Sequence, residues 1–132
     1  MFYAKNFKGK FGIVTGAASG IGRATAIHLA QAGAGLSLVD LAEEQLSALA
    51  SEIEKANLLR PLALTANVSS EVDVEGFAKA TLAAFGRIDF LVTSAGVLRR
   101  TAFQEILPDE WTWFLPSTCA EPTSVVRPSY LP

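Results

Sequence analysis

A glycine-rich segment between an apolar run and a helical pattern is the feature that most constrains the fold of this chain. Residues 15–22 read Thr-Gly-Ala-Ala-Ser-Gly-Ile-Gly, after an apolar run from Phe11 and before a helical pattern from Ile21 to about Gly33. Glycines in a turn between a strand and a helix let the backbone approach a pyrophosphate. Free N–H groups at the helix start, with the positive end of the helix dipole, then hold the anion. The segment therefore predicts a phosphate cradle.

An acidic residue on the next apolar run supports this interpretation. Asp40 ends that run, 18 residues after Gly22. A carboxylate about 20 residues past the last glycine is placed to accept hydrogen bonds from an adenosine ribose. The glycine-rich segment and Asp40 together therefore favour a dinucleotide site over an ordinary tight turn.

Composition narrows the class of protein. The chain has 132 residues, which allows one domain at most, and its 50% hydrophobic and 18% charged residues suit a packed core. A net charge of −2 gives no electrostatic reason to expect nucleic acid or an anionic membrane as a partner. No apolar stretch reaches the roughly 18 residues that span a bilayer, and residues 1–10 lack the apolar run of a secretory signal. With Cys119 as its single cysteine, the chain is expected to be cytoplasmic, and no metal site is predicted.

Short apolar runs alternate with longer periodic segments. Strands are predicted at residues 11–15, 36–39, 61–66 and 88–93, and helices at residues 21–33, 42–56 and 70–85. Such alternation implies a parallel sheet with right-handed crossovers. With the glycine turn after the first strand, the prediction is an α/β fold whose doubly wound sheet has the order 3-2-1-4 and ends after about four strands.

The periodicity also predicts which residues each helix buries. The expected buried faces are Gly22, Ala26, Leu29 and Gly33 in the first helix, Leu46, Leu49, Ile53 and Ala56 in the second, and Val74, Phe77, Ala78, Thr81, Leu82 and Phe85 in the third. Gly33 and Gly86 are predicted to end the first and third helices. Ser70, with Asp73 three residues later, resembles a capping box at the start of the third helix.

The last part of the chain changes character. Pro108-Asp109-Glu110-Trp111 predicts the start of a fourth helix. No helix or strand period can be read from Phe114 onward, where four of the six prolines lie. We therefore expect a folded domain over residues 1–113 and an irregular, proline-rich tail over residues 114–132.

These motifs resemble those of the short-chain dehydrogenase/reductase family over roughly residues 8–113. Residues 15–22 are similar to its Thr-Gly-x-x-x-Gly-x-Gly signature, Asn67-Val68 to its Asp-Val or Asn-Val pair beside the adenine, and residues 88–97 to its fourth-strand motif. The resemblance implies a Rossmann-like, NAD(P)-binding domain over residues 1–113. It also implies an oxidoreductase that moves a hydride between NAD(P) and a small-molecule alcohol or ketone.

The resemblance implies a cofactor site residue by residue. Its members would be Gly16, Ala17, Ala18, Ser19, Gly20, Ile21, Gly22, Asp40, Asn67, Val68, Ser94, Ala95 and Gly96. Residues 16–21 would line the pyrophosphate, Asp40 would hold the ribose hydroxyls, and Thr15 would hydrogen-bond toward the turn at residues 95–96. Asp40 would repel the 2′-phosphate of NADP, and Arg23, the nearest cation, is expected to point to solvent. NAD is therefore the predicted cofactor, and NADP is disfavoured.

Two departures from the family pattern bear on catalysis. Thr93-Ser94 replaces the usual Asn-Asn of the fourth-strand motif. The family's Tyr-x-x-x-Lys pair, in which tyrosine is the general acid/base, has no counterpart: Tyr3 is followed four positions later by Phe7, and Tyr130 stands two residues from the end. The expectation is the N-terminal part of such an enzyme without its C-terminal catalytic part, so no catalytic residue is assigned.

Three interpretations stay open on sequence alone. The chain is an NAD-dependent short-chain dehydrogenase by descent, a non-catalytic dinucleotide-binding fragment, or a truncated product with no function of its own. A sheet that ends after four strands leaves residues 88–93 as an apolar edge. Such an edge predicts marginal stability and self-association.

Overall fold

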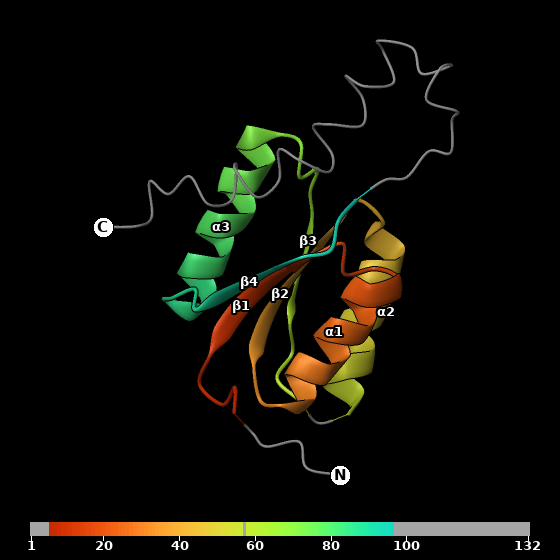
Figure 1. The fold of residues 1–132 in the computed structure, drawn as a ribbon, viewed down its shortest axis with the longest axis vertical. Coiled ribbons are helices and arrows are strands. Elements are labelled where there is room, and N and C mark those ends of the chain that lie inside the picture. Colours follow the sequence, from red (N-terminus) through yellow and green to blue (C-terminus); the bar gives the residue numbers. More distant parts are fainter. Residues whose placement is uncertain (1–5, 57, 97–132) are drawn as a thin grey trace, which may run out of the picture.

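Four parallel strands form the centre of the fold. The computed structural model describes residues 6–56 and 58–96. The strands are β1 Phe11–Thr15, β2 Gly35–Asp40, β3 Leu62–Thr65 and β4 Phe90–Thr93 (Figure 1). β1 pairs in parallel with β2 and with β4, and β2 pairs in parallel with β3. The sheet order is therefore β3-β2-β1-β4, which confirms the predicted 3-2-1-4 arrangement.

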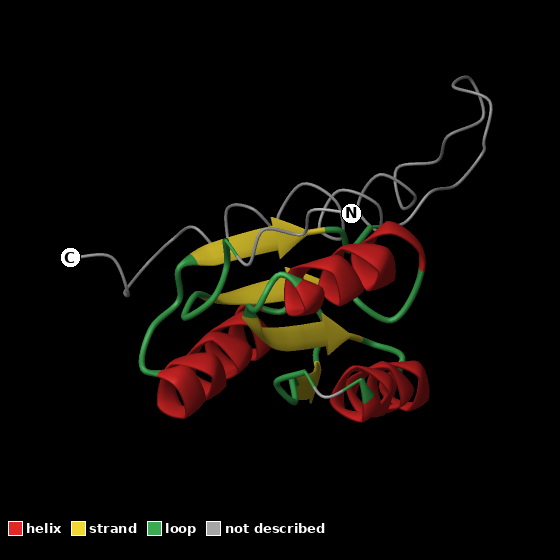
Figure 2. Cartoon of the chain, turned by 90° about the horizontal axis from the view of Figure 1, so that it is seen from below, coloured by secondary structure: helices red, strands yellow, loops and turns green. Residues whose placement is uncertain are grey.

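The helices of the described residues connect the strands and cover both faces of the sheet. They are α1 Gly20–Gln31, α2 Glu43–Lys55 and α3 Glu71–Phe85. α1 and α2 lie on one face and α3 lies on the other, as Figure 1 shows. The view from below in Figure 2 likewise has helices on both sides of the strand layer. This is the expected doubly wound α/β fold.

Strand residues alternate between two apolar clusters, one on each face of the sheet. Val14 of β1, with Leu36 and Leu38 of β2, packs against α1 and α2. Ile13 and Val39, the neighbours of these residues along the strands, pack against α3. All five are at most 2% exposed. Burial on both faces explains why the strands read as continuous apolar runs in the sequence.

α1 packs closely on the sheet through small residues. Gly22, Ala26 and Ala30 are buried, and Leu29 is only partly buried against the same cluster. The predicted buried face is therefore confirmed at Gly22 and Ala26. At its third position the buried residue is Ala30 instead of Leu29. The reason is helical geometry: the stripe continues to Ala30, four residues after Ala26.

The buried stripe of α2 differs from the prediction at its end. Leu46, Leu49 and Ile53 are buried as expected, together with Ala50, but Ala56 is exposed. Ala56 is the C-cap of α2 and therefore lies beyond the last helical turn that faces the sheet. In α3 the predicted face is buried over its first part, whereas its last two members, at positions 82 and 85, are half-buried.

The helix ends lie at predicted capping residues. Gly86 is the C-cap of α3, and Gly33 directly follows the C-cap of α1. Ser70 is the N-cap of α3, and its Oγ accepts a hydrogen bond from the Asp73 N–H at 3.3 Å. The Asp73 carboxylate does not return to Ser70; it accepts a hydrogen bond from the Asn67 N–H at 2.8 Å. The predicted capping box is therefore half formed, and Asp73 instead holds the loop that precedes α3.

A buried pair of hydroxyls joins α3 to the sheet. Ser37 of β2 and Thr81 of α3 are fully buried, and their side-chain oxygens lie 2.8 Å apart. Thr81 Oγ1 also lies 2.7 Å from the carbonyl oxygen of Phe77. Because a hydroxyl has one proton, Thr81 donates to Phe77 while Ser37 donates to Thr81. These bonds satisfy the polar atoms, so Thr81 can belong to the buried face of α3 as predicted.

Asp89 fastens the start of β4 to the start of β1. Its carboxylate accepts a hydrogen bond from the Phe11 N–H at 2.9 Å, and its own N–H donates to the Phe11 carbonyl at 2.7 Å. The Arg87 Nε also donates to this carboxylate, at 2.9 Å. The hydrogen bond from Arg87, and after it the one from Phe11, lower the pKa of Asp89 below its usual value of 3.8. The charged carboxylate is therefore the form that joins the two strands.

Acid is expected to destabilise the sheet through Asp89. Its pKa is lower in the folded than in the unfolded chain, so its stabilising contribution is complete above pH 3.8 and is lost as the pH falls through the folded-state pKa. Unfolding midpoints measured from neutral to strongly acidic pH should therefore depend less on pH in Asp89→Asn than in the unaltered chain. Glu75→Gln, at an exposed acid of α3, is the control and should keep the full dependence. An unchanged acid profile in Asp89→Asn would contradict this role.

Some predictions concern residues that the structure does not describe. The expected helix at residues 108–111, the tail at residues 114–132, and Tyr3, Cys119 and Tyr130 all lie outside the described residues. The domain boundary at residue 113 therefore stays a prediction. Within residues 6–56 and 58–96, no helix has the length and apolar character needed to cross a membrane.

Candidate functional site

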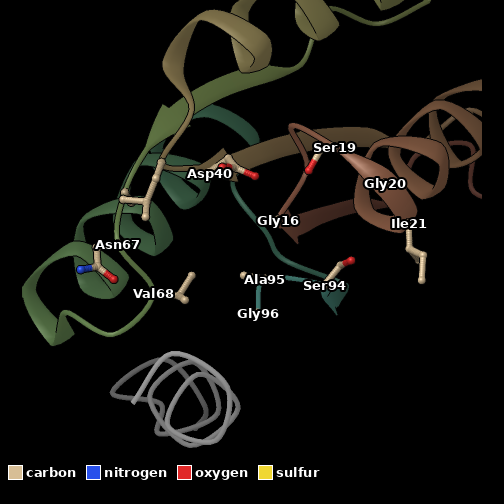
Figure 3. Close-up of a pocket in the computed structure, with 12 residues that line it drawn as sticks. Gly16, Ser19, Gly20, Ile21, Asp40, Asn67, Val68, Ser94, Ala95 and Gly96 are labelled. Carbon is tan, nitrogen blue, oxygen red and sulfur yellow. The ribbon is translucent and has the colours of Figure 1, made fainter. Parts of the chain in front are cut away.

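A pocket lies at the carboxyl edge of the sheet, where the four strands end (Figure 3). Its volume is about 390 Å³. The lining residues come from the last residue of β2 and from the segments that follow β1, β2, β3 and β4. They are Gly16, Ser19, Gly20, Ile21, Asp40, Leu41, Ala66, Asn67, Val68, Ser94, Ala95 and Gly96. Open α/β sheets bind ligands outside the carboxyl ends of their strands, at the point where the strand order reverses. Because β1 stands between β2 and β4, the glycine-rich segment that follows it occupies that point.

Most of the residues predicted from the sequence meet in this pocket. Ten of the thirteen line it, and the exceptions are Ala17, Ala18 and Gly22. Leu41 and Ala66 line it without having been predicted. Both are direct chain neighbours of predicted residues at strand ends. Leu41 follows Asp40 and Ala66 precedes Asn67, so the carboxyl-edge rule, extended by one residue on either side of the predicted positions, would have found them.

Ala17 and Ala18 attach the glycine-rich segment to β2 instead of lining the pocket. Both residues are buried. The Ala17 N–H donates to the carbonyl oxygen of Val39 at 3.2 Å, and the Ala18 N–H donates to Asp40 Oδ2 at 3.0 Å. These two amides are therefore used within the protein and contribute to the pocket by holding the segment in place.

Gly16 and Gly22 stand where backbone segments approach closely. A Cβ on Gly16, whose φ is +67°, would lie 2.5 Å from the Ala95 nitrogen. A Cβ on Gly22 would lie 2.1 Å from the carbonyl oxygen of Gly16. The Ser94 N–H donates a hydrogen bond to the Thr15 carbonyl at 3.2 Å, which holds the segment after β4 beside the glycine-rich segment. The hydrogen bond expected from Thr15 toward residues 95–96 stays a prediction. Glycine is required at both positions because any side chain would push these segments apart.

The amino end of α1 opens onto the pocket. Ser19 is the N-cap, its side chain caps no N–H group, and no acidic residue lies in the first turn. The start of α3, by contrast, is capped by the Ser70 hydroxyl. Gly20 has φ +57°, and a Cβ there would meet nothing within 4 Å. Among the described residues, the leading amides of α1, with the positive end of its dipole, therefore form a site for an anion that neither the N-cap side chain nor a first-turn acid compensates.

Asp40 is the only charged residue among the described residues that line the pocket. Its Oδ2 accepts from the Ala18 N–H at 3.0 Å, and its Oδ1 accepts from the Ala42 N–H at 3.1 Å. Figure 3 shows the carboxylate on the side of the pocket that Ser19 also lines. A carboxylate has about four lone-pair sites, so each oxygen keeps the capacity to accept a further hydrogen bond. Asp40 is therefore oriented by the backbone and still able to bind hydroxyl groups of a ligand.

Asn67 and Val68 form the wall opposite the glycine-rich segment. Asn67 Oδ1 accepts hydrogen bonds from the Ser69 N–H at 3.0 Å and from the Ser69 hydroxyl at 2.7 Å. With the Asp73 bond to its backbone, this turn fixes the segment after β3. Asp73, which the sequence predicts only as a capping-box residue, therefore positions this loop, because its carboxylate binds the Asn67 N–H rather than the N-cap. Val68 and Leu41 add apolar surface to the pocket, which suits a flat base.

The arrangement combines three chemical capacities along one pocket: helix amides for a phosphate, a carboxylate for hydroxyl groups, and apolar walls for a ring. Within the described residues, no group of three or more His, Cys, Asp or Glu side chains is placed to hold a metal ion. The geometry therefore matches a nucleotide or a dinucleotide.

Known proteins resemble this chain over most of its length. The sequence model of the short chain dehydrogenase family matches residues 10–116. The chain is 43% identical over 104 residues to 11-beta-hydroxysteroid dehydrogenase-like 6 of Arabidopsis thaliana, a match that covers 79% of this chain and 30% of the relative. It is 46% identical over 86 residues to levodione reductase of Leifsonia aquatica, covering 64% of this chain and 32% of the relative. The chain therefore spans about a third of the length of these curated relatives.

Solved structures share the fold. A short chain dehydrogenase from Mycobacterium smegmatis superposes with a TM-score of 0.87 at 30% identity, over 92% of this chain and 50% of that structure. A dehydrogenase/reductase from Sinorhizobium meliloti 1021 superposes with a TM-score of 0.89 at 31% identity, over 95% of this chain and 50% of that structure. The described sheet and helices thus correspond to part of a larger fold in these proteins.

Proposed function

This chain belongs to the short-chain dehydrogenase family, and on that premise we propose that its pocket binds the adenosine and pyrophosphate of a nicotinamide dinucleotide. The observation that carries the proposal is the uncapped amino end of α1, which faces the same pocket as the Asp40 carboxylate. The leading amides of α1 would hold the pyrophosphate, and Asp40 would accept hydrogen bonds from the adenosine ribose. Val68 and Leu41 would contact the adenine ring.

The dinucleotide that fits this pocket best is NAD. The 2′-phosphate of NADP would lie close to the Asp40 carboxylate, and the described lining residues offer no positive charge to compensate the repulsion. The ribose of NAD instead presents a hydroxyl, which Asp40 can bind as an acceptor. NAD is therefore proposed as the cofactor and NADP as the weaker ligand.

The reaction proposed for the protein is hydride transfer between NAD and an alcohol or ketone, the chemistry that the bound nicotinamide supplies. The described residues would bind and orient the adenosine half of the cofactor for this reaction. No Tyr-x-x-x-Lys occurs within the 132 residues, so the proton-transfer step that this pair performs in the family has no assigned residue here. A cytoplasmic location and self-association through the edge of β4 likewise stay predictions.

The alternative is a dinucleotide-binding chain that does not itself catalyse, which the described pocket supports equally, because its groups suit binding of the adenosine half of a cofactor. Hydride transfer would then require catalytic residues from elsewhere. A panel of alcohols tested with NAD separates the two readings. Specific NADH formation by this chain alone supports the oxidoreductase, and its absence alongside tight binding supports the binding chain.

Titration with NADH tests the proposed binding site directly. We expect NADH fluorescence to be enhanced on binding and the enhancement to saturate. Excess NAD should displace NADH and reverse the enhancement, because both dinucleotides share the adenosine and pyrophosphate that the pocket would hold. AMP should compete more weakly, because it lacks the pyrophosphate that the α1 amides bind. Fluorescence that rises only linearly with NADH concentration would indicate no binding. It would support the third interpretation, a truncated chain with no function of its own.

A further inference from the structure

Arg23 and Glu52 form an ion pair that joins α1 to α2. The Arg23 guanidinium contacts the Glu52 carboxylate, and the two side chains are 42% and 55% exposed. The sequence predicts that Arg23 points to solvent, and its side chain is indeed exposed, but its guanidinium is also held by an acid 29 residues further along the chain.

Without the ion pair to Glu52, the Arg23 guanidinium would lie closer to the pocket. Arg23 lies one turn after Ser19, and its N–H donates to the Ser19 carbonyl at 3.2 Å. Ser19 lines the pocket on the side where Asp40 stands (Figure 3). Helical side chains lean toward the amino end of their helix, and residues four apart share a face. A released Arg23 side chain would therefore lean toward Ser19 and Asp40.

Glu52 draws the guanidinium in the opposite direction. α2 begins beside Asp40, whose Oδ1 binds the Ala42 N–H at the α2 N-cap. Glu52 lies nine residues after Glu43, the first residue of α2. At 1.5 Å per residue, this separation places it roughly 13 Å along the helix axis from the pocket end of α2. The ion pair therefore keeps the positive charge of Arg23 away from the carboxyl edge of the sheet.

From these contacts we infer that Glu52 is a specificity-determining residue for the dinucleotide. By pairing with Arg23, it withholds from the pocket the cation that would compensate Asp40 and attract a 2′-phosphate. The inference rests on the proposed binding of a nicotinamide dinucleotide. It assigns the preference for NAD to two acids rather than to Asp40 alone: Asp40 repels the 2′-phosphate, and Glu52 keeps Arg23 from neutralising that repulsion.

The test is the ratio of the dissociation constants of NADH and NADPH, measured by fluorescence titration at low ionic strength. Glu52→Gln should shift this ratio toward NADPH by about fivefold, the size of one exposed charge–charge interaction. Glu54→Gln is the matched control, because Glu54 is a half-exposed acid of the same helix that pairs with Arg60 instead. It removes the same charge and should leave the ratio unchanged.

A double variant tests whether Arg23 causes the shift in the ratio of dissociation constants. Adding Arg23→Gln to Glu52→Gln should restore the original ratio, because no released cation then remains. An equal ratio in Glu52→Gln and Glu54→Gln would overturn the inference, as would a double variant that keeps the shift. If NADH still binds saturably, either of these two outcomes contradicts only the inference about Glu52 and leaves the proposed function intact. No saturable binding of either dinucleotide by the unaltered chain would contradict the proposed function and the inference together.

Discussion

Gly22→Ala is expected to destabilise the fold by about 2–3 kcal/mol, the range of an overpacked core position. The added methyl would lie 2.1 Å from the Gly16 carbonyl oxygen and 2.7 Å from its carbonyl carbon. Both are backbone atoms, so no side-chain rotation relieves the contact, and the glycine-rich segment must move away from α1. NADH binding should weaken roughly a hundredfold, because the amides that form the phosphate site no longer keep their relative positions.

Gly76→Ala provides the matched control for this substitution. Gly76 is also helical, in α3, and a Cβ there would meet nothing within 4 Å. The same change should stabilise the chain by about 0.5–1 kcal/mol, because alanine is the better helix former. Urea unfolding measures both variants. Equal unfolding midpoints and equal NADH affinities in the two variants would show that the close approach of Gly22 to Gly16 is not required.

Asp40→Ala is expected to weaken NADH binding about 30- to 150-fold, which corresponds to about 2–3 kcal/mol for hydrogen bonds from ribose hydroxyls to a charged acceptor. NADPH binding should weaken far less, because the substitution also removes the repulsion of the 2′-phosphate. The preference for NAD over NADP should therefore shrink or disappear, as measured by fluorescence titration of both reduced dinucleotides.

The same substitution has a structural cost that must be separated from binding. It removes the acceptor of the Ala18 and Ala42 N–H groups, so a loss of stability accompanies it. A structural loss alone would weaken both dinucleotides equally, whereas the proposed role changes their ratio. Glu44→Ala, at an exposed acid in the first turn of α2, removes one nearby charge without these bonds and should leave the ratio unchanged. An equal loss for NADH and NADPH in Asp40→Ala would show that Asp40 only supports the loop.

Local patterns were enough to predict the fold and most of the residues that line the pocket. Strand and helix alternation, with glycine after the first strand, determines the sheet order, and the strand ends then bring Gly16, Asp40 and Ser94 to one edge. Ser70 and Gly86 carry their capping information in their own residue types, so the ends of α3 were predictable as well.

The sequence did not predict the contacts between segments far apart in the chain. Whether the Ala18 amide faces a ligand or β2 depends on the approach of Asp40, 22 residues away, which no local period reveals. The same holds for Arg23, whose partner lies on another helix. At Ala56 the helical period was continued past the real end of α2, because an alanine gives no capping signal. Local sequence patterns therefore predict the helices and strands. The orientation of backbone amides and charged side chains can be read only from the packed structure.

Amide chemical shifts of the ¹⁵N-labelled chain, followed during addition of NADH, test directly whether the α1 amides and Asp40 form a dinucleotide site. We expect saturable shifts of the Ser19, Gly20 and Ile21 amides and of the amide of Leu41 beside Asp40, with Gly76 on the opposite face of the sheet unaffected. Saturating NADH that leaves the leading amides of α1 unshifted, or shifts confined to residues outside the pocket, would contradict it.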